Sequence, residues 1–579
     1  FDQVKPGANE TFLLKASLDE MKSYKKVHYL ASLVMDKGDA YLQQYKQNGN
    51  ALQLMHAIGT YKIADALLNR IKAEQSETSS KLFWRNDTRR LYEHAIEACL
   101  LQNNTSDAFY FFEKSRATLL NDQLIAQHWL AAEDITRMIQ MRKKLSEIDH
   151  ASEAAASNPD EYARLSVQRS QIINDIYSLE GLVKKRNPLY YSNMIDTNAV
   201  SLHSVQQMLM KERQVLLELF AGDSAVYSLL VTPAGVQLKK IDKRLYNTLT
   251  TAFLYYTSDA GRLNSNFTAY RKTAHELYNL LFQGMPVSKG RIIISPDGSY
   301  FPFEALITDN TLEKPVYFVK DYAVSYTYSA GYLQNSFSSD STHSEKFLLG
   351  VAPVRYASRL NLPPLEGSDA SLKKIHRFYG GYLDLVGEKA SREKFLSSFS
   401  EYSVVQFYTH ASDSSADSSG HNEPVIYFAD APLYLSELMP QERSVTRLIV
   451  LSACESAGGR VYQGEGVFSF NRGFAALGIP SSITNLWAVE NRSTYRLTEL
   501  FYKYMAEGHS LDVALQMAKL EFIDNTADRE ALPYYWSAAI MMGKTDPIVY
   551  PKRSNMKWLF LAVLAIPAFV VLRRYRKKN

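Results

Sequence analysis

The sequence predicts an α + α/β protein, with an N-terminal helical-repeat array and a helical hairpin, then an α/β domain with a mostly parallel sheet, then one C-terminal transmembrane helix. Three observations predict this order. Apolar residues recur at three- and four-residue spacing over residues 23–130. From about residue 200, short apolar runs alternate with helical patterns. Finally, an uncharged apolar run lies near the end of the chain, at Trp558–Leu572.

Length and composition limit the possible classes of protein. A chain of 579 residues is too long for one core, so we expect several domains. A net charge of +4 implies no strong field for nucleic acid. The two cysteines, Cys99 and Cys454, exclude a disulfide framework and a multi-cysteine metal site, and we expect no cofactor or metal.

The predicted units are helical repeats at 1–130, a hairpin linker at 131–199, the α/β domain at 200–547 (lobes 200–345 and 346–547), a linker at 548–557, the transmembrane helix at 558–572 and a basic tail at 573–579.

The first 130 residues predict paired antiparallel helices. Four amphipathic segments are separated by polar breaks rich in Asn, Gly and Ser: Lys25–Gln47, Ala51–Lys72, Ser80–Gln102 and Asp107–Leu130. They have features of tetratricopeptide repeats, although the period is not a regular 34 residues. Such arrays bind a partner or a neighbouring domain, so we expect a regulatory protein partner on these helices. Residues 131–187 are charged and helical with one break, which predicts a helical hairpin.

The α/β domain is predicted from apolar runs that lie between turn signals. Each run is short enough for a buried strand, and helical patterns separate them, which is typical of a parallel sheet. The predicted strands are Val215–Phe220, Val226–Val231, Arg291–Ser295, Val324–Tyr328, Phe347–Val351, Val404–Tyr408, Leu448–Ser452 and Ser482–Trp487. The predicted helices are Tyr246–Tyr255, Ala274–Phe282, Ser368–Phe378, Ser391–Phe399, Gly464–Leu477, Ser493–Ala506 and Ser510–Ile523.

The run Trp558–Leu572 predicts a single-pass membrane anchor. Its 15 residues rise roughly 22 Å as a helix, less than a hydrocarbon core of about 30 Å, so flanking Lys and Arg side chains would have to snorkel. A buried core helix is the alternative. The basic tail favours a cytoplasmic C-terminus. The chain begins with Phe1, so we expect a periplasmic body if an upstream signal peptide existed and a cytoplasmic one otherwise.

Two predicted strands end in reactive residues. The strand Val404–Tyr408 is followed by His410, and the strand Leu448–Ser452 by Cys454. Ligands bind outside the carboxyl ends of parallel strands, so both side chains are expected on one edge of the sheet. A thiolate nucleophile needs a nearby imidazole that lowers its pKa and later protonates the leaving amine. Taken singly, each has a plainer interpretation: a buried inert cysteine and a satisfied histidine. Cys99, on an amphipathic helix, is expected in the core.

An ordered set of motifs resembles the CHAT family, caspase-like peptidase domains found with tetratricopeptide repeats in bacteria. The nucleophile motif, Leu451–Ser456 with Gly464–Gly466, matches most closely. The other matching segments are Ala108–Ala117, Lys185–Pro188, Ile294–Gly298, Pro302–Leu306, the His410 strand, Ser482–Glu490 and Pro533–Gly543.

The resemblance implies roles for five residues. Cys454 is the expected nucleophile and His410 the expected general base and acid, with the backbone N–H groups of Cys454 and Ala411 binding the oxyanion. The family usually has Gly where this chain has Ala411, so a positive φ there would cost about 1 kcal/mol. Glu490 and Trp487 are candidates for the substrate pocket, and Glu490 replaces the usual Asp. The alternative for Glu490 is a carboxylate at a helix start.

We therefore predict a membrane-anchored cysteine endopeptidase that cleaves a protein substrate and is regulated through its helical repeats. Two alternatives stay open. One is a catalytically inactive caspase-like signalling scaffold, in which His410 and Cys454 do not meet. The other is a protein-binding module in which the helical array alone carries the function.

Overall fold

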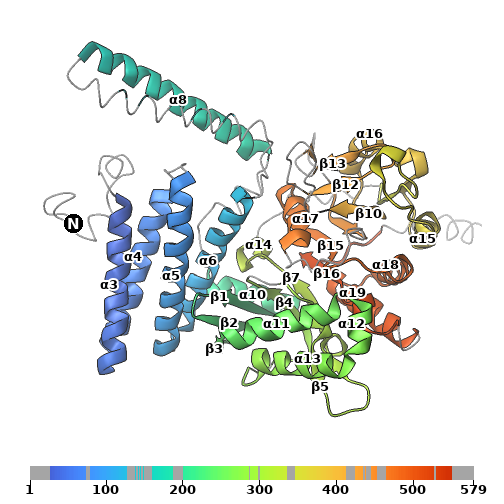
Figure 1. The fold of residues 1–579 in the computed structure, drawn as a ribbon, viewed down its shortest axis with the longest axis horizontal. Coiled ribbons are helices and arrows are strands. Elements are labelled where there is room, and N and C mark those ends of the chain that lie inside the picture. Colours follow the sequence, from blue (N-terminus) through green and yellow to red (C-terminus); the bar gives the residue numbers. More distant parts are fainter. Residues whose placement is uncertain are drawn as a thin grey trace, which may run out of the picture.

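A computed structural model describes residues 27–72, 78–126, 159–186, 200–334, 346–412, 424–452 and 465–550, apart from a few positions within these ranges, together with isolated positions between 137 and 151. Helices α3 to α6 stand side by side at one end of the molecule, and the α/β domain forms the other end (Figure 1). A long helix, α8 (Pro159–Arg186), extends beyond the repeat helices (Figure 1). It is the second helix of the predicted hairpin, whereas most of the first lies outside the described residues.

Four helices are present where the sequence predicts them in the first 130 residues, and their assignment as repeats stays a prediction. They are α3 (Val27–Asn48), α4 (Ala51–Lys72), α5 (Thr78–Gln102) and α6 (Thr105–Ala126). Neighbouring helices bury small and aromatic residues against one another, among them Ala31, Ala57, Tyr61 and Phe111. Asn103, with φ 55°, takes the left-handed conformation between α5 and α6 that Asn tolerates. Cys99 is buried in this core as expected, and burial raises the pKa of its thiol.

The predicted fold class is wrong in one respect, the transmembrane helix. In the part of the chain that the structure describes, no helix is both long and apolar enough to cross a membrane. The run at 558–572 lies outside the described residues. Its 15 apolar residues are fewer than the roughly 20 that a spanning helix needs, which is the physical weakness of the prediction. The membrane localisation, which rested on that helix, is corrected with it.

One 11-stranded sheet forms the centre of the α/β domain, so the two predicted lobes share a continuous layer. Most neighbours are parallel; the antiparallel pairs are β1 with β2, β2 with β3, and β15 with β16. In spatial order the strands are β3 (Gly235–Asp242), β2 (Ala225–Thr232), β1 (Gln214–Ala221), β4 (Gly290–Ser295), β7 (Tyr322–Tyr326), β16 (Ala539–Gly543), β15 (Ser481–Asn485), β14 (Leu448–Leu451), β10 (Val404–Phe407), β8 (Leu348–Ala352) and β9 (Tyr382–Val386).

Helices connect and cover these strands. They are α10 (Leu202–Glu212), α11 (Lys243–Thr257), α12 (Ala260–Ser265), α13 (Phe267–Phe282), α14 (Ala330–Gln334), α15 (Ser368–Ile375), α16 (Arg392–Leu396), α17 (Glu465–Ala476), α18 (Asn491–Ala506), α19 (Leu511–Asp524) and α20 (Pro533–Trp536). Two small sheets lie outside the main one: β5 (Ile307–Asp309) with β6 (Val316–Tyr317), and β11 (Ala411–Ser412) with β12 (Val425–Tyr427) and β13 (Pro432–Tyr434).

The strands around the predicted site are buried on both faces, which is why they read as continuous apolar runs. Side chains alternate between the two faces of a strand. Val405 and Phe407 belong to one core, with the aromatic rings of Phe395 and Phe474 from α16 and α17. Val404 instead belongs to the core that includes residues of α15, α18 and α19. The central strands are thus held rigidly, and their carboxyl ends are fixed in place.

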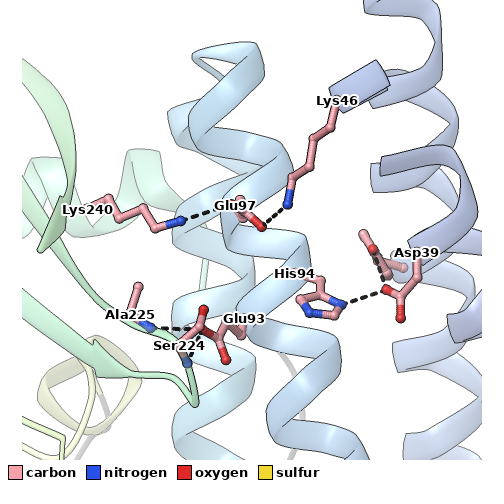
Figure 2. Close-up of polar contacts among 9 residues, drawn as sticks. Asp39, Lys46, Glu93, His94, Glu97, Ser224, Ala225 and Lys240 are labelled. Atoms are coloured by element: carbon pink, nitrogen blue, oxygen red, sulfur yellow. Dashed lines mark hydrogen bonds and ion pairs between the residues drawn. The ribbon is translucent and has the colours of Figure 1, made fainter. Parts of the chain in front are cut away.

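The repeat helices are attached to the α/β domain by polar contacts. The Glu93 carboxylate of α5 accepts backbone N–H groups of Ser224 (2.8 Å) and Ala225 (3.1 Å) in the β1–β2 turn (Figure 2). Gly222 permits this approach, because a Cβ there would lie 2.4 Å from the Glu93 carboxyl carbon. Glu97 bridges Lys46 of α3 and Lys240 of β3, at 2.9 Å each (Figure 2).

Helix α6 makes the deepest of these contacts. The Arg116 guanidinium is buried and donates to the carbonyl groups of Leu219, Ser295 and Pro296, at the ends of β1 and β4. One turn earlier, Glu113 accepts the N–H groups of Ala330 and Gly331, each at 2.9 Å. The segment that resembles the last repeat of the family therefore joins the array to the sheet.

Candidate active site

The strands that precede the two predicted catalytic positions, β10 and β14, end at the same edge of the sheet. They are parallel neighbours, with Val404 opposite Leu448 and Phe407 opposite Leu451. His410 follows three residues after Phe407, and Cys454 three residues after Leu451. The premise that both strands run in the same direction is confirmed. Cys454 lies outside the described residues, so the pairing of its thiol with His410 stays a prediction.

His410 is buried and oriented by the loop that follows β8. Only 3% of its surface is exposed. Its Nε2 lies 2.8 Å from the carbonyl oxygen of Pro363, and since a carbonyl only accepts, Nε2 carries the proton. In a neutral ring Nδ1 is then the unprotonated nitrogen, and it is buried without a hydrogen-bond partner among the described residues. This is the tautomer in which Nδ1 accepts a proton from a thiol.

Ala411, the predicted oxyanion donor, opens strand β11 without backbone strain. It lies opposite Ile426 of β12, and its φ is not positive, so the cost expected for replacing Gly does not arise. The Tyr427 N–H donates to the His410 carbonyl at 2.9 Å, which makes the neighbouring pair the hydrogen-bonded one. In an antiparallel ladder, the N–H of the next residue then points away from the partner strand. The Ala411 N–H is therefore not used by β12.

The end of β14 is held by a hydrogen-bond chain through Ser452. Its Oγ accepts from Gln406 Nε2 at 3.1 Å and lies 3.1 Å from Thr498 Oγ1 of α18. The Ser452 N–H donates to the Phe407 carbonyl at 3.0 Å. Gln406 is a buried polar residue in an apolar strand, and sequence reasoning did not single it out. These bonds fix the backbone two residues before Cys454.

The two substrate-pocket candidates lie after β15 in different environments. Trp487 is buried, and its indole N–H donates to the Tyr534 carbonyl at 3.1 Å. Glu490 is exposed, occupies the N-cap position of α18 and accepts a hydrogen bond from the Ser493 hydroxyl at 3.2 Å. This is the helix-start position that the alternative interpretation expected. Contact of either residue with a substrate stays a prediction.

A small cavity of about 20 Å³ lies beside the carboxyl ends of β14 and β15. Among its lining residues, Asn485 Nδ2 and Thr494 Oγ1 are buried without hydrogen-bond partners in the described structure. The space suits a single water molecule rather than a substrate side chain. Within the described residues, no three His, Cys, Asp or Glu side chains are grouped as a metal site would require.

Sequence reasoning missed three residues that surround His410: Tyr356, Pro363 and Thr409. Tyr356 and Pro363 lie in the loop that follows β8. Because β8 is a parallel neighbour of β10, the two strands end at the same edge of the sheet. The sequence carried no signal for them, because the adjacency of β8 and β10 that gathers these loops together is a feature of the tertiary structure.

The comparison with known families agrees with this arrangement. Residues 271–544 match the CHAT domain. This bears out the resemblance, and the caspase-like peptidase fold that goes with it, for slightly less than half of the chain. Strands β1 to β3 precede the matched range and nevertheless belong to the same sheet as the strands within it.

Solved structures give more distant similarities. The Saccharomyces cerevisiae separase–securin complex aligns with 11% identity and a TM-score of 0.39, over 93% of this chain but only 48% of the other chain. The Arg-specific cysteine proteinase gingipain R aligns with 9% identity and a TM-score of 0.29, over 53% of this chain and 77% of the other. The Porphyromonas gingivalis RgpB complex of pro- and mature domains aligns with 10% identity and a TM-score of 0.31, over 53% of this chain and 78% of the other. No curated protein matches the chain.

Proposed function

We propose that this protein is a cysteine endopeptidase in which Cys454 and His410 form the catalytic pair of the CHAT domain. The observation that carries the proposal is the environment of His410, whose Nε2 lies 2.8 Å from the Pro363 carbonyl oxygen while Nδ1 is buried without a partner among the described residues. Among the described residues Nδ1 has no hydrogen-bond partner, and a buried acceptor without a partner loses hydration without compensation, which favours a use for this nitrogen in catalysis.

The proposed reaction is thiol acyl transfer. The Cys454 thiol gives its proton to His410 Nδ1, and the thiolate attacks the scissile carbonyl carbon. The N–H groups of Ala411 and Cys454 stabilise the negative oxygen of the tetrahedral intermediate. The imidazolium then protonates the leaving amine, the C–N bond breaks, and water releases the acyl group from sulfur.

The test compares four forms of the full-length protein: wild type, Cys454→Ala, His410→Ala and Cys99→Ala. Each is incubated with a proteome-derived peptide library, and new amino termini are identified by mass spectrometry. We expect cleavage by wild type and by Cys99→Ala, and none by the other two. Equal cleavage by Cys454→Ala, or none by wild type after the Cys454 thiol has been shown to be accessible to a thiol electrophile, contradicts the proposal and favours the inactive scaffold.

We further propose that a protein partner bound to α3–α6 regulates the CHAT domain. The support is the polar attachment of α5 and α6 to the edge of the sheet through Glu93, Glu97 and Arg116. A partner that changes the packing of the repeats would act on strands β1 to β3. Glu97→Ala, which removes both Lys bridges, should change the cleavage rate of a fixed peptide. An unchanged rate would assign the repeats to recruitment alone.

A further inference from the structure

The hydroxyl group of Tyr356 lies in a hydrogen-bond chain that determines the backbone at His410. The His410 N–H donates to Tyr356 Oη at 3.2 Å, and Tyr356 Oη lies 3.0 Å from Thr409 Oγ1. Thr409 Oγ1 also donates to the Tyr427 carbonyl. Since a carbonyl only accepts, the single hydroxyl proton of Thr409 goes there, and Tyr356 must donate to Thr409.

These hydrogen bonds all run in one direction from donor to acceptor, and they form a closed ring that begins and ends at His410. It runs from the His410 N–H through the Tyr356 and Thr409 hydroxyl groups to the Tyr427 carbonyl, and the Tyr427 N–H returns to the His410 carbonyl at 2.9 Å. Every donor and acceptor in it is used once. Burial raises the pKa of Tyr356 to about 12, so the phenol keeps the proton that it donates.

The aromatic ring of Tyr356 also packs against the imidazole. The two ring centroids are 5.1 Å apart, with planes inclined at 47°. The same loop supplies the Pro363 carbonyl that receives Nε2–H. Tyr356 therefore restrains His410 twice, through the main chain and through the ring.

The loop that carries Tyr356 is held in a strained conformation. Val354 has φ 60°, and the Arg355 N–H donates to the Pro353 carbonyl at 2.6 Å across it, which is the rare γ-turn with positive φ. A β-branched residue is a genuine outlier in this region. The Leu365 N–H bonded to the Val354 carbonyl and the Ala357 N–H bonded to the Ala429 carbonyl, both at 2.8 Å, hold the loop there. Such strain persists where a fixed geometry is needed.

We propose that Tyr356 is a positioning residue for the catalytic pair. It sets the main chain at His410 and Ala411 together, so that the base Nδ1 and the oxyanion donor N–H keep a fixed relation to each other. This inference rests on the proposed peptidase function, and its test is designed to fail separately from that function.

The experiment uses full-length protein in a Cys99→Ala background, which leaves Cys454 as the one thiol. The rate of alkylation by iodoacetamide is followed between about pH 5 and pH 9, which needs no substrate. Tyr356→Phe removes the hydroxyl group and keeps the ring. We expect alkylation near about pH 6 to slow by about tenfold, and the midpoint of the profile to move toward the free-thiol value of about 8.5.

The matched control is Tyr379→Phe. Tyr379 is also buried and its hydroxyl donates one hydrogen bond, to the Tyr502 carbonyl at 2.8 Å, but it packs on Phe347 at the amino end of β8. It should leave the alkylation profile unchanged. Thr409→Val breaks the same chain at its other member and should reproduce the effect of Tyr356→Phe. If Tyr356→Phe does not fold, the alkylation profile of Thr409→Val tests the role of the hydrogen-bond chain instead.

The outcomes separate the two proposals. If His410→Ala leaves the alkylation profile as in the parent, the catalytic pair itself is absent and the proposed function fails. If His410→Ala changes the profile while Tyr356→Phe and Thr409→Val match the parent, the pair stands and the role of Tyr356 is overturned. Equal changes in Tyr356→Phe and Tyr379→Phe would also overturn it, because the effect would then be one of general packing.

Discussion

Phe407 lies directly opposite Leu451 in the parallel pairing of β10 with β14. The separation of 44 residues between them is also the separation of His410 and Cys454, so the spacing of the two catalytic candidates equals the register offset of their strands. A shift of one residue would turn every side chain of one strand to the other face. The register that buries Val405 and Phe407 in one core therefore also aligns the carboxyl ends of β10 and β14 with each other.

The tautomer of His410 leads to a spectroscopic prediction. Because Nε2 donates to the Pro363 carbonyl at 2.8 Å, the neutral imidazole should be protonated at Nε2. Nitrogen chemical shifts of selectively labelled histidine, assigned by comparison with His410→Ala, would show this. A neutral ring protonated at Nδ1 would contradict the assignment of Nδ1 as the base.

Ala411 should tolerate glycine but not proline. Ala411→Gly restores the usual residue of the family at a position that needs no positive φ, so we expect activity within about twofold of wild type and a stability loss of about 0.5–1 kcal/mol. Ala411→Pro removes the N–H, and we expect kcat to fall by about 10²–10³. Thermal unfolding of both variants is the control. A Pro variant that folds and retains full activity would exclude this N–H as the oxyanion donor.

Arg116 should be a large contributor to stability. Its removal takes a buried, charged donor away from the carbonyl groups of Leu219, Ser295 and Pro296, so Arg116→Ala should lower the free energy of unfolding by about 3 kcal/mol or more. Arg90, a half-exposed arginine on α5 paired with Asp36, provides the control, and Arg90→Ala should cost less than about 1 kcal/mol. Urea denaturation measures both. Similar losses would mean that Arg116 is not a joint between α6 and the sheet.

Glu93 should make the protein less stable as pH falls below the usual pKa of a glutamate side chain. Burial raises its pKa, but the hydrogen bonds from Ser224, Asp223 and Ala225 outweigh burial, and the net pKa is lowered. A lowered pKa means that the contribution is complete above the unfolded value of about 4.3 and disappears as pH falls through the folded pKa. Glu93→Gln should lose about 2 kcal/mol at neutral pH and much less near pH 3, measured by denaturation across that range. A loss that does not change with pH would contradict this account.

Glu218 should make stability depend on pH in the opposite direction to Glu93. This β1 carboxyl is fully buried beside Glu113, and burial and that neighbouring charge raise its pKa well above the usual range. A raised pKa means that stability is complete below about pH 4.3 and is lost as pH rises toward the folded pKa. Glu218→Gln, which has the same shape and no charge, should therefore be more stable than wild type at neutral pH. The gain should vanish near pH 4, and a gain that stays constant would assign it to packing.

The sequence by itself determined the local elements and the positions where chemistry could occur. The apolar runs and helical periods gave the repeat helices and the strands around the site because burial on both faces leaves a short-range pattern in the residues. Exposed or interrupted strands such as β9 and β3 gave no such pattern and were missed. An apolar run near the chain end led to the wrong prediction of a spanning helix, because hydrophobicity over 15 residues does not specify what surrounds it.

Only the tertiary structure decided how these elements are joined. Strand β16 lies between β7 and β15 and makes one sheet of two predicted lobes. The choice of Nδ1 as the free nitrogen depends on Pro363, 47 residues before His410, and the backbone there depends on Tyr356, 54 residues before it. Contacts over such separations come from the packing of the β8 loop against β10. No pattern in neighbouring residues records them, because their free energy comes from the folded arrangement alone.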